Sequence, residues 1–171
     1  MKIRFQKALT FQQFLEEVRD SQHPWQEFYQ RARVPEDILR RAGQLGGSWN
    51  LLVLAEGWCG DGANSIPYLA RLAEALPNMD LRILLRDENP DLMNGHLTGE
   101  ARAIPVVMIL DEEFREVGWW GPRPTLLQEI FPREIKPLPV PERYPKVRAW
   151  YAKDWGRSTL EEVLSRIPVS V

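Results

Sequence analysis

Apolar residues in the first 48 positions recur at helical spacing. Between residues 8 and 18 they return every three or four positions, which predicts a helix with one apolar face. His23-Pro24 breaks this pattern, and the aromatic cluster that begins at Trp25 predicts a short second helix. A third helix is predicted over 35–45, because proline is favoured in a first turn and Gly46-Gly47 follows its last turn. We therefore interpret residues 1–48 as a helical extension packed on a core.

The hydrophobic pattern changes after residue 48. The run over 50–57 reads NLLVLAEG, a compact apolar segment that ends at a glycine and is typical of a strand buried on both faces. Residues 63–76 return to helical spacing and are followed by Pro77-Asn78. A second apolar strand with a turn is predicted over 81–90, and a short helix over 90–98.

The next segment predicts a hairpin. Residues 105–110 and 114–119 are two strand-like runs joined by an acidic turn, and a helix is predicted to begin at Thr125 and to stop before Pro132. A helix between the first two strands makes them parallel, and the hairpin adds antiparallel pairing. The order of elements predicts an α/β core over residues 49–131.

Residues 132–171 are interpreted as part of the same domain. Five of the 14 prolines lie within 131–145, which predicts an extended segment that wraps the body. Helices are predicted over 150–155 and 159–167, with Ser158 as the cap of the second.

Composition narrows the class of protein. The chain has 171 residues, 44% hydrophobic and 27% charged, as expected for one globular domain. A net charge of −2 offers no general attraction to nucleic acid or to anionic membranes. The N-terminus lacks the apolar run of a signal peptide, and no stretch approaches the length of a membrane span, so a cytoplasmic protein is expected. Neither a cofactor nor a metal is expected, because one cysteine with His23 and His96 is a poor zinc set.

Cys59 is the only cysteine, so no internal disulfide is possible. A lone cysteine is most often a small buried hydrophobic residue. Here it follows a predicted strand and precedes a predicted helix, whose free N–H groups would lower the thiol pKa. Gly60 and Gly62 are expected to leave the sulfur uncovered. These features predict a reactive thiol, and that prediction requires an exposed sulfur.

The sequence Trp58-Cys59-Gly60-Asp61 resembles the active-site motif of thioredoxins. Ala103-Ile104-Pro105 resembles the cis-proline segment of that family, 46 residues after the cysteine when counted to the proline. Asp87-Glu88-Asn89-Pro90 is similar to a thioredoxin turn, and Gly118 matches a glycine in the last strand. The tryptophan-rich run over 119–124 makes the chain look most like a group of bacterial thioredoxin-like proteins of poorly defined function.

The resemblance implies a thioredoxin-like three-layer α/β/α sandwich. Its mixed sheet would have about four strands, with a helical N-terminal extension and a C-terminal helical tail. It also implies Cys59 as the nucleophile, facing a groove in which an extended peptide or thiol compound binds. The residues expected to shape this groove are Trp58, Gly60, Asp61, Ile104 and Pro105. By its position Asp61 is also a helix-charge or capping residue, and Arg123 is either a carboxylate-binding residue or part of a surface salt bridge.

Three positions depart from the family pattern. The second cysteine is replaced by Gly62, so no resolving thiol exists in the chain. Thioredoxins have a buried carboxylate in the strand before the nucleophile and a lysine near it. In this sequence their positions correspond to Val53 and to about Ile83, so both groups are missing. The leading hypothesis is a monothiol redox protein, which as an enzyme would be a thiol-disulfide oxidoreductase. In it, Cys59 forms mixed disulfides or reversible adducts with protein or low-molecular-weight thiols. The alternative is a redox-inactive module that binds proteins. The sequence leaves the oligomeric state open.

Overall fold

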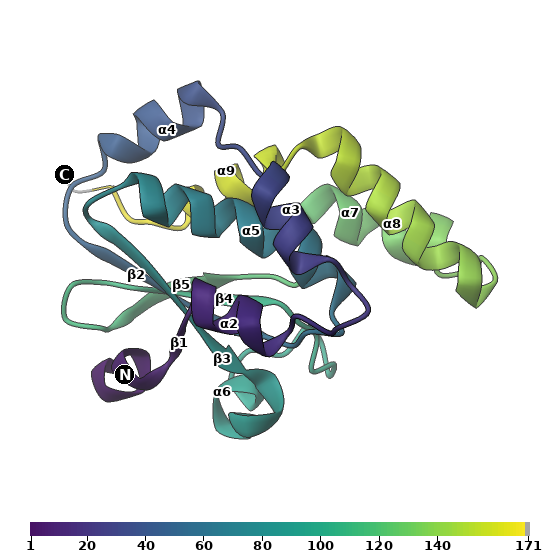
Figure 1. Cartoon of the computed structure of the whole chain (residues 1–171), viewed down its shortest axis with the longest axis horizontal. Coiled ribbons are helices and arrows are strands. Elements are labelled where there is room, and N and C mark those ends of the chain that lie inside the picture. Colours follow the sequence, from purple (N-terminus) through teal and green to yellow (C-terminus); the bar gives the residue numbers. More distant parts are fainter. Residues whose placement is uncertain (170–171) are drawn as a thin grey trace.

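The computed structural model describes residues 1–169 and shows a five-stranded mixed sheet with helices on both sides (Figure 1). The strands, in the order β1-β3-β2-β4-β5, are β1 Leu9–Thr10, β3 Met79–Leu85, β2 Trp49–Ala55, β4 Val106–Leu110 and β5 Glu116–Trp120. Strands β2 and β3 are parallel and every other pair is antiparallel. The predicted α/β class is confirmed.

The sheet has one strand more than predicted. Strand β1 has two residues and pairs with β3 at the edge, between α1 (Lys2–Lys7) and α2 (Phe11–Glu17). A strand of two residues is too short to show an alternation of apolar and polar side chains. The helical spacing that begins at residue 8 therefore predicts a helix there. Thr10 ends β1 and caps α2, where it exchanges hydrogen bonds with Gln13 in a capping box.

Alternate side chains of β2 point to opposite faces of the sheet and into two separate cores. Leu51, Val53 and Ala55 pack with the helices of one face, whereas Leu52 and Leu54 pack with those of the other. The first face is covered by α2, α3 (Trp25–Arg31), α4 (Glu36–Gly43), α5 (Gly60–Ala75) and α9 (Arg157–Ser165). The second is covered by α1 and α6 (Pro90–Asn94). The continuous apolar run in β2 therefore reflects burial on both sides, as predicted.

The proline-rich segment 131–145 is not extended, so that prediction is wrong. Residues Phe131–Ile135 form one turn of π-helix after α7 (Thr125–Ile130), and α8 spans Val140–Asp154. Pro139 and Pro141 occupy the cap and first turn of α8, where a proline loses no helical hydrogen bond and has the required φ. The prolines at these positions thus favour the start of a helix and do not indicate extended chain. Helix α8 and α7 share a small third core around Leu127, Ile135, Val147 and Tyr151.

The cap of the last helix also differs from the prediction. Gly156 occupies the N-cap of α9 with φ 73°, and Ser158 lies inside the helix, where it donates hydrogen bonds to Asp154. An ideal Cβ on Gly156 would lie 2.3 Å from the ring of Tyr68. Glycine is required here both by the left-handed backbone and by the adjacent ring.

Gly156→Ala is expected to lower the free energy of unfolding by about 1–3 kcal/mol, because left-handed strain adds to the clash with Tyr68. Urea unfolding followed by circular dichroism measures this change. Gly99→Ala is the matched control, because Gly99 also has positive φ but open space around its Cβ position. Equal losses in the two variants would show that the Tyr68 contact contributes nothing.

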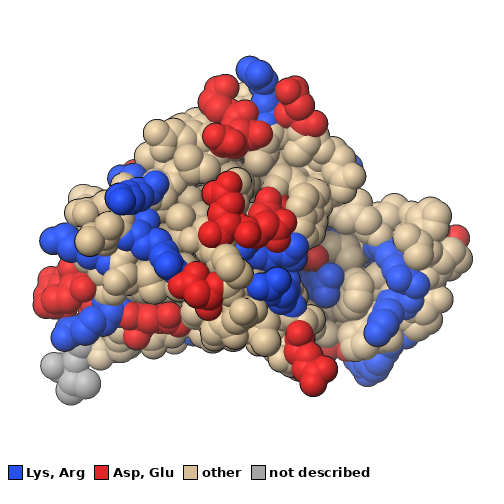
Figure 2. Space-filling model, turned by 90° about the horizontal axis from the view of Figure 1, so that it is seen from below, with Lys and Arg blue, Asp and Glu red and all other residues tan. Residues whose placement is uncertain are grey.

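Charges are mixed over the lower face of the molecule. Figure 2 shows acidic side chains near the middle of this face with basic ones to either side, and no continuous basic surface across it. Within residues 1–169, no helix is long and apolar enough to cross a membrane.

Candidate functional site

The site is built where β2 ends and α5 begins. Cys59 is the N-cap of α5, and its Sγ accepts a hydrogen bond from the Gly62 N–H at 3.3 Å. The thiol donates in turn to the Ile104 carbonyl, also at 3.3 Å. The Ile104–Pro105 peptide bond is cis and directly precedes β4. The fold therefore brings the cysteine and the proline segment together across 45 residues of sequence.

The sulfur is not exposed. Cys59 is only 6% exposed and packs in the second core. Burial and, to a smaller extent, the nearby Asp61 carboxylate together raise the pKa of its thiol to about 12, against the opposing effect of the Gly62 N–H. The prediction of an uncovered sulfur with a lowered pKa is wrong for this conformation, because desolvation outweighs the helix start.

Aromatic rings occupy the space beside the two glycines. An ideal Cβ on Gly60 would lie 2.3 Å from Cε2 of Tyr144, and one on Gly62 would lie 3.0 Å from the Trp25 ring. The absence of side chains at these positions thus admits rings from α8 and α3. Solvent does not fill the space, which is why the glycines do not expose the sulfur.

Tyr144 is held in place by two residues from other elements. Asn64 of α5 donates from Nδ2 to the Tyr144 hydroxyl at 3.1 Å, and the His23 ring lies 4.8 Å from the Tyr144 ring, centroid to centroid. The His23 Nε2 also lies 3.1 Å from the Trp58 carbonyl oxygen, so it donates there. We call His23, Asn64 and Tyr144 the cover of the site. No sequence pattern indicates a role for any of the three.

A second buried group ties α5 to α8. The Asp61 carboxylate accepts a hydrogen bond from Arg123 Nε at 3.0 Å and from the Tyr151 hydroxyl at 2.9 Å. The side chains of Arg123 and Asp61 are 19% and 14% exposed, and the guanidinium stacks 3.9 Å from the Phe131 ring centroid. Arg123 therefore forms a buried salt bridge, and neither a surface pair nor a free ligand-binding site. Both partners donate to the Oδ1 atom of Asp61.

Trp58 is the exposed member of the predicted groove. Its side chain is 49% exposed, and the Arg86 guanidinium lies 4.8 Å from its ring centroid. Arg86 also donates to the carbonyl of Arg102, so it links Trp58 to the chain that leads into the proline segment. Ile104 and Pro105 are buried. Trp58, Cys59, Gly60, Ile104 and Pro105 thus lie in one region, of which only Trp58 offers a large surface.

The family model described as thioredoxin matches residues 8–136. The chain belongs to the thioredoxin family. The comparison with curated proteins found no match. A crystal structure of a Pseudomonas aeruginosa protein of unknown function is similar over 95% of this chain and 93% of that one, with a TM-score of 0.74 and 24% identity. An HIV epitope scaffold is similar over 95% and 94%, with a TM-score of 0.70 and 24% identity. At this identity both structures show the fold alone.

This member of the thioredoxin family lacks the proton-handling pair inferred from the family pattern. Val53 and Ile83 are partners in the parallel β2–β3 register, and both are fully buried. The positions of the missing carboxylate and lysine therefore lie side by side and are filled by apolar side chains. Among residues 1–169, no group of three or more His, Cys, Asp or Glu residues is placed to hold a metal ion.

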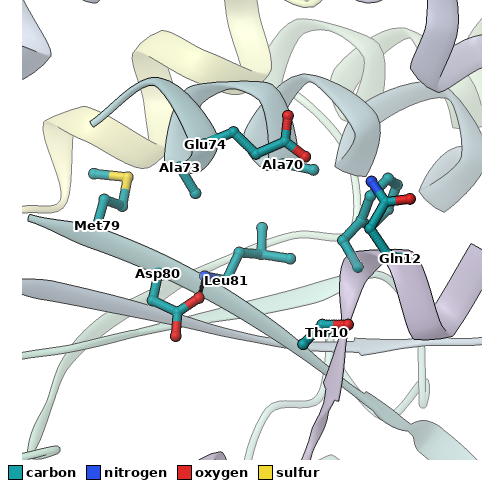
Figure 3. Close-up of a pocket in the computed structure, with 9 residues that line it drawn as sticks. Thr10, Gln12, Ala70, Ala73, Glu74, Met79, Asp80 and Leu81 are labelled. Carbon is teal, nitrogen blue, oxygen red and sulfur yellow. Dashed lines mark hydrogen bonds between the residues drawn. The ribbon is translucent and has the colours of Figure 1, made fainter. Parts of the chain in front are cut away.

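A separate pocket lies between α2, α5 and β3 (Figure 3). Its two carboxylates are already bonded, Glu74 to the Tyr29 hydroxyl at 2.6 Å and Asp80 to the Leu81 N–H at 2.8 Å. Cys59 does not line it. We assign no chemistry to this pocket.

Proposed function

We propose that the protein is a monothiol redox protein in which Cys59 forms mixed disulfides after the cover opens. The observation that supports this best is the position of the Cys59 Sγ, 3.3 Å from both the Gly62 N–H at the start of α5 and the Ile104 carbonyl before the cis proline. A thiolate at that point keeps the Gly62 N–H donor and loses its bond to the Ile104 carbonyl, which is then free to accept a hydrogen bond from an extended substrate. The covered conformation is then a protected resting state.

The chemical step needs a disulfide co-substrate of the low-molecular-weight or protein class. When the cover opens, the thiol loses its proton to solvent and the thiolate attacks one sulfur of R–S–S–R′. The Cys59–S–S–R bond forms, the S–S bond of the substrate breaks, and R′S⁻ leaves and takes a proton from solvent. Because Gly62 stands where the second cysteine would be, a thiol from outside the chain must then attack the mixed disulfide and release Cys59.

Burial of the sulfur favours a second candidate, a redox-inactive binding module. With a pKa of about 12, roughly one thiol in 10⁵ is ionised at pH 7 in the covered conformation. In that case Cys59 only donates a structural hydrogen bond, and the exposed Trp58 is the residue available to a protein partner.

The two candidates differ in how the thiol is reached. We expect the native protein to gain one glutathionyl group from glutathione disulfide, with a rate that depends only weakly on urea, because opening of the cover exposes little surface. Mass spectrometry counts the group, dithiothreitol removes it, and Cys59→Ser gains none. A rate that follows the full urea dependence of global unfolding would exclude the redox proposal and leave the binding module.

The pH dependence of Cys59 alkylation tests whether the thiol is covered in the native protein. Because the covered thiol stays protonated, the population of open thiolate rises about tenfold per pH unit past the free-thiol pKa of about 8.5. The logarithm of the iodoacetamide rate is therefore expected to rise linearly from pH 7 to pH 10. A plateau at or below pH 8.5 would show a thiol that titrates as if it were uncovered.

A further inference from the structure

A hollow of about 200 Å³ lies between α3, α5 and the C-terminal end of α8. Its walls are aromatic, with Phe28, Tyr68 and Trp155 from three different elements. The volume is below that of a typical drug-sized site and suits a molecule of one or two rings. Asn64 of the cover lines the hollow, but Cys59 does not, so a ligand there would not contact the thiol.

Trp155 has an unusual conformation for a bulky residue. It ends α8 in the left-handed region, with φ 54° and ψ 34°, and its side chain is 68% exposed. The next residue, Gly156, adopts φ 73° without steric cost. A tryptophan that is both strained and exposed to water stabilises neither the backbone nor the core, which points to a role in binding.

Two arginines line the hollow. Arg148 lies 5.3 Å from the Phe28 ring centroid and belongs to none of the ion pairs formed within residues 1–169. The second arginine at the hollow, Arg31, is paired with Glu27. The nearby Asp154 carboxylate accepts hydrogen bonds from Ser158 and keeps its negative charge, but it does not line the hollow. Arg148 is therefore the charge available to a ligand, and it selects an anion.

We propose that this hollow binds a flat aromatic carboxylate. The ring system packs against the aromatic walls, and the carboxylate pairs with the Arg148 guanidinium, whose planar fork suits that group. This site does not depend on the proposed thiol chemistry, so Cys59→Ser is expected to bind the same ligand with unchanged affinity.

Isothermal titration of the full chain with 2-naphthoate and with neutral 2-naphthamide tests the proposal. We expect naphthoate to bind about tenfold more tightly, and Arg148→Gln to remove that difference. Lys153→Gln on the same helix is the matched control, because Lys153 does not line the hollow, and is expected to change nothing. Equal affinity for the two probes, no binding at millimolar concentration, or an unchanged preference in Arg148→Gln would each overturn the proposal.

Trp155→Gly separates binding from folding. Glycine relieves the left-handed strain, so the midpoint of thermal unfolding is expected to stay the same or to rise. The affinity for naphthoate is expected to fall at least fivefold, because one aromatic wall is lost. A variant that is more stable and yet binds naphthoate as well as the original chain would remove Trp155 from the site and contradict the proposal.

Discussion

Tyr144→Ala is expected to raise the rate of Cys59 alkylation at pH 8 by about ten- to hundredfold. The Tyr144 ring fills the space over Gly60, and its hydroxyl accepts a hydrogen bond from Asn64. Its removal therefore takes away one contact between α8 and the start of α5 beside the thiol. Loss of a partly buried aromatic ring costs on the order of 2 kcal/mol, and each 1.4 kcal/mol shifts the opening equilibrium tenfold.

The measurement is the rate of iodoacetamide incorporation at Cys59, read by intact mass. Tyr144→Phe is the matched control, because it keeps the ring over Gly60 and removes only the hydroxyl that Asn64 contacts. Its rate is expected to rise less than fivefold, in line with one hydrogen bond. If Tyr144→Ala reacts no faster than the original chain while its urea midpoint is lower, the ring contributes to stability but does not protect the thiol.

The core of the fold could be predicted because its signals are local. The buried strand that became β2 is a continuous apolar run, and its reading as a strand needs no knowledge of distant residues. The meeting of Cys59 with Ile104 came from the resemblance to thioredoxins, since no local pattern places them together. Strand β1 was missed because it owes its structure to pairing with β3 and shows no pattern of its own.

The state of the thiol could not be predicted from the residues around it. Glycines beside a cysteine are compatible with an open site and also with one filled by rings from elsewhere. Here the ring comes from Tyr144, 85 positions after Cys59, in a segment whose prolines suggested extended chain. A salt bridge is one of the two roles predicted for Arg123, but its partner Asp61 and its burial could not be predicted, because 62 positions separate the two residues.

Arg123→Met is expected to lower the free energy of unfolding by about 3–5 kcal/mol at pH 7. Methionine keeps an apolar contact with Phe131, but it leaves the Asp61 carboxylate buried without its cation. Burial already raises the pKa of Asp61 above its ordinary value of 3.8, and loss of the guanidinium raises this pKa further.

The pH dependence and a second substitution identify the cause of that loss. A carboxyl whose folded pKa is raised stabilises the fold below its unfolded pKa and loses that contribution as the pH rises through the folded pKa. Arg123→Met is therefore expected to be least destabilised below pH 4 and progressively more so toward pH 7, as urea unfolding at several pH values would show.

Asp61→Asn in the same chain is expected to recover most of the loss, because it removes the buried charge while keeping an acceptor for Tyr151. Arg19→Met, which breaks exposed pairs with Glu16 and Asp20, is the control and is expected to leave the stability unchanged. A loss that is independent of pH and persists in the double variant would mean that Arg123 acts through packing on Phe131 and that its charge contributes nothing.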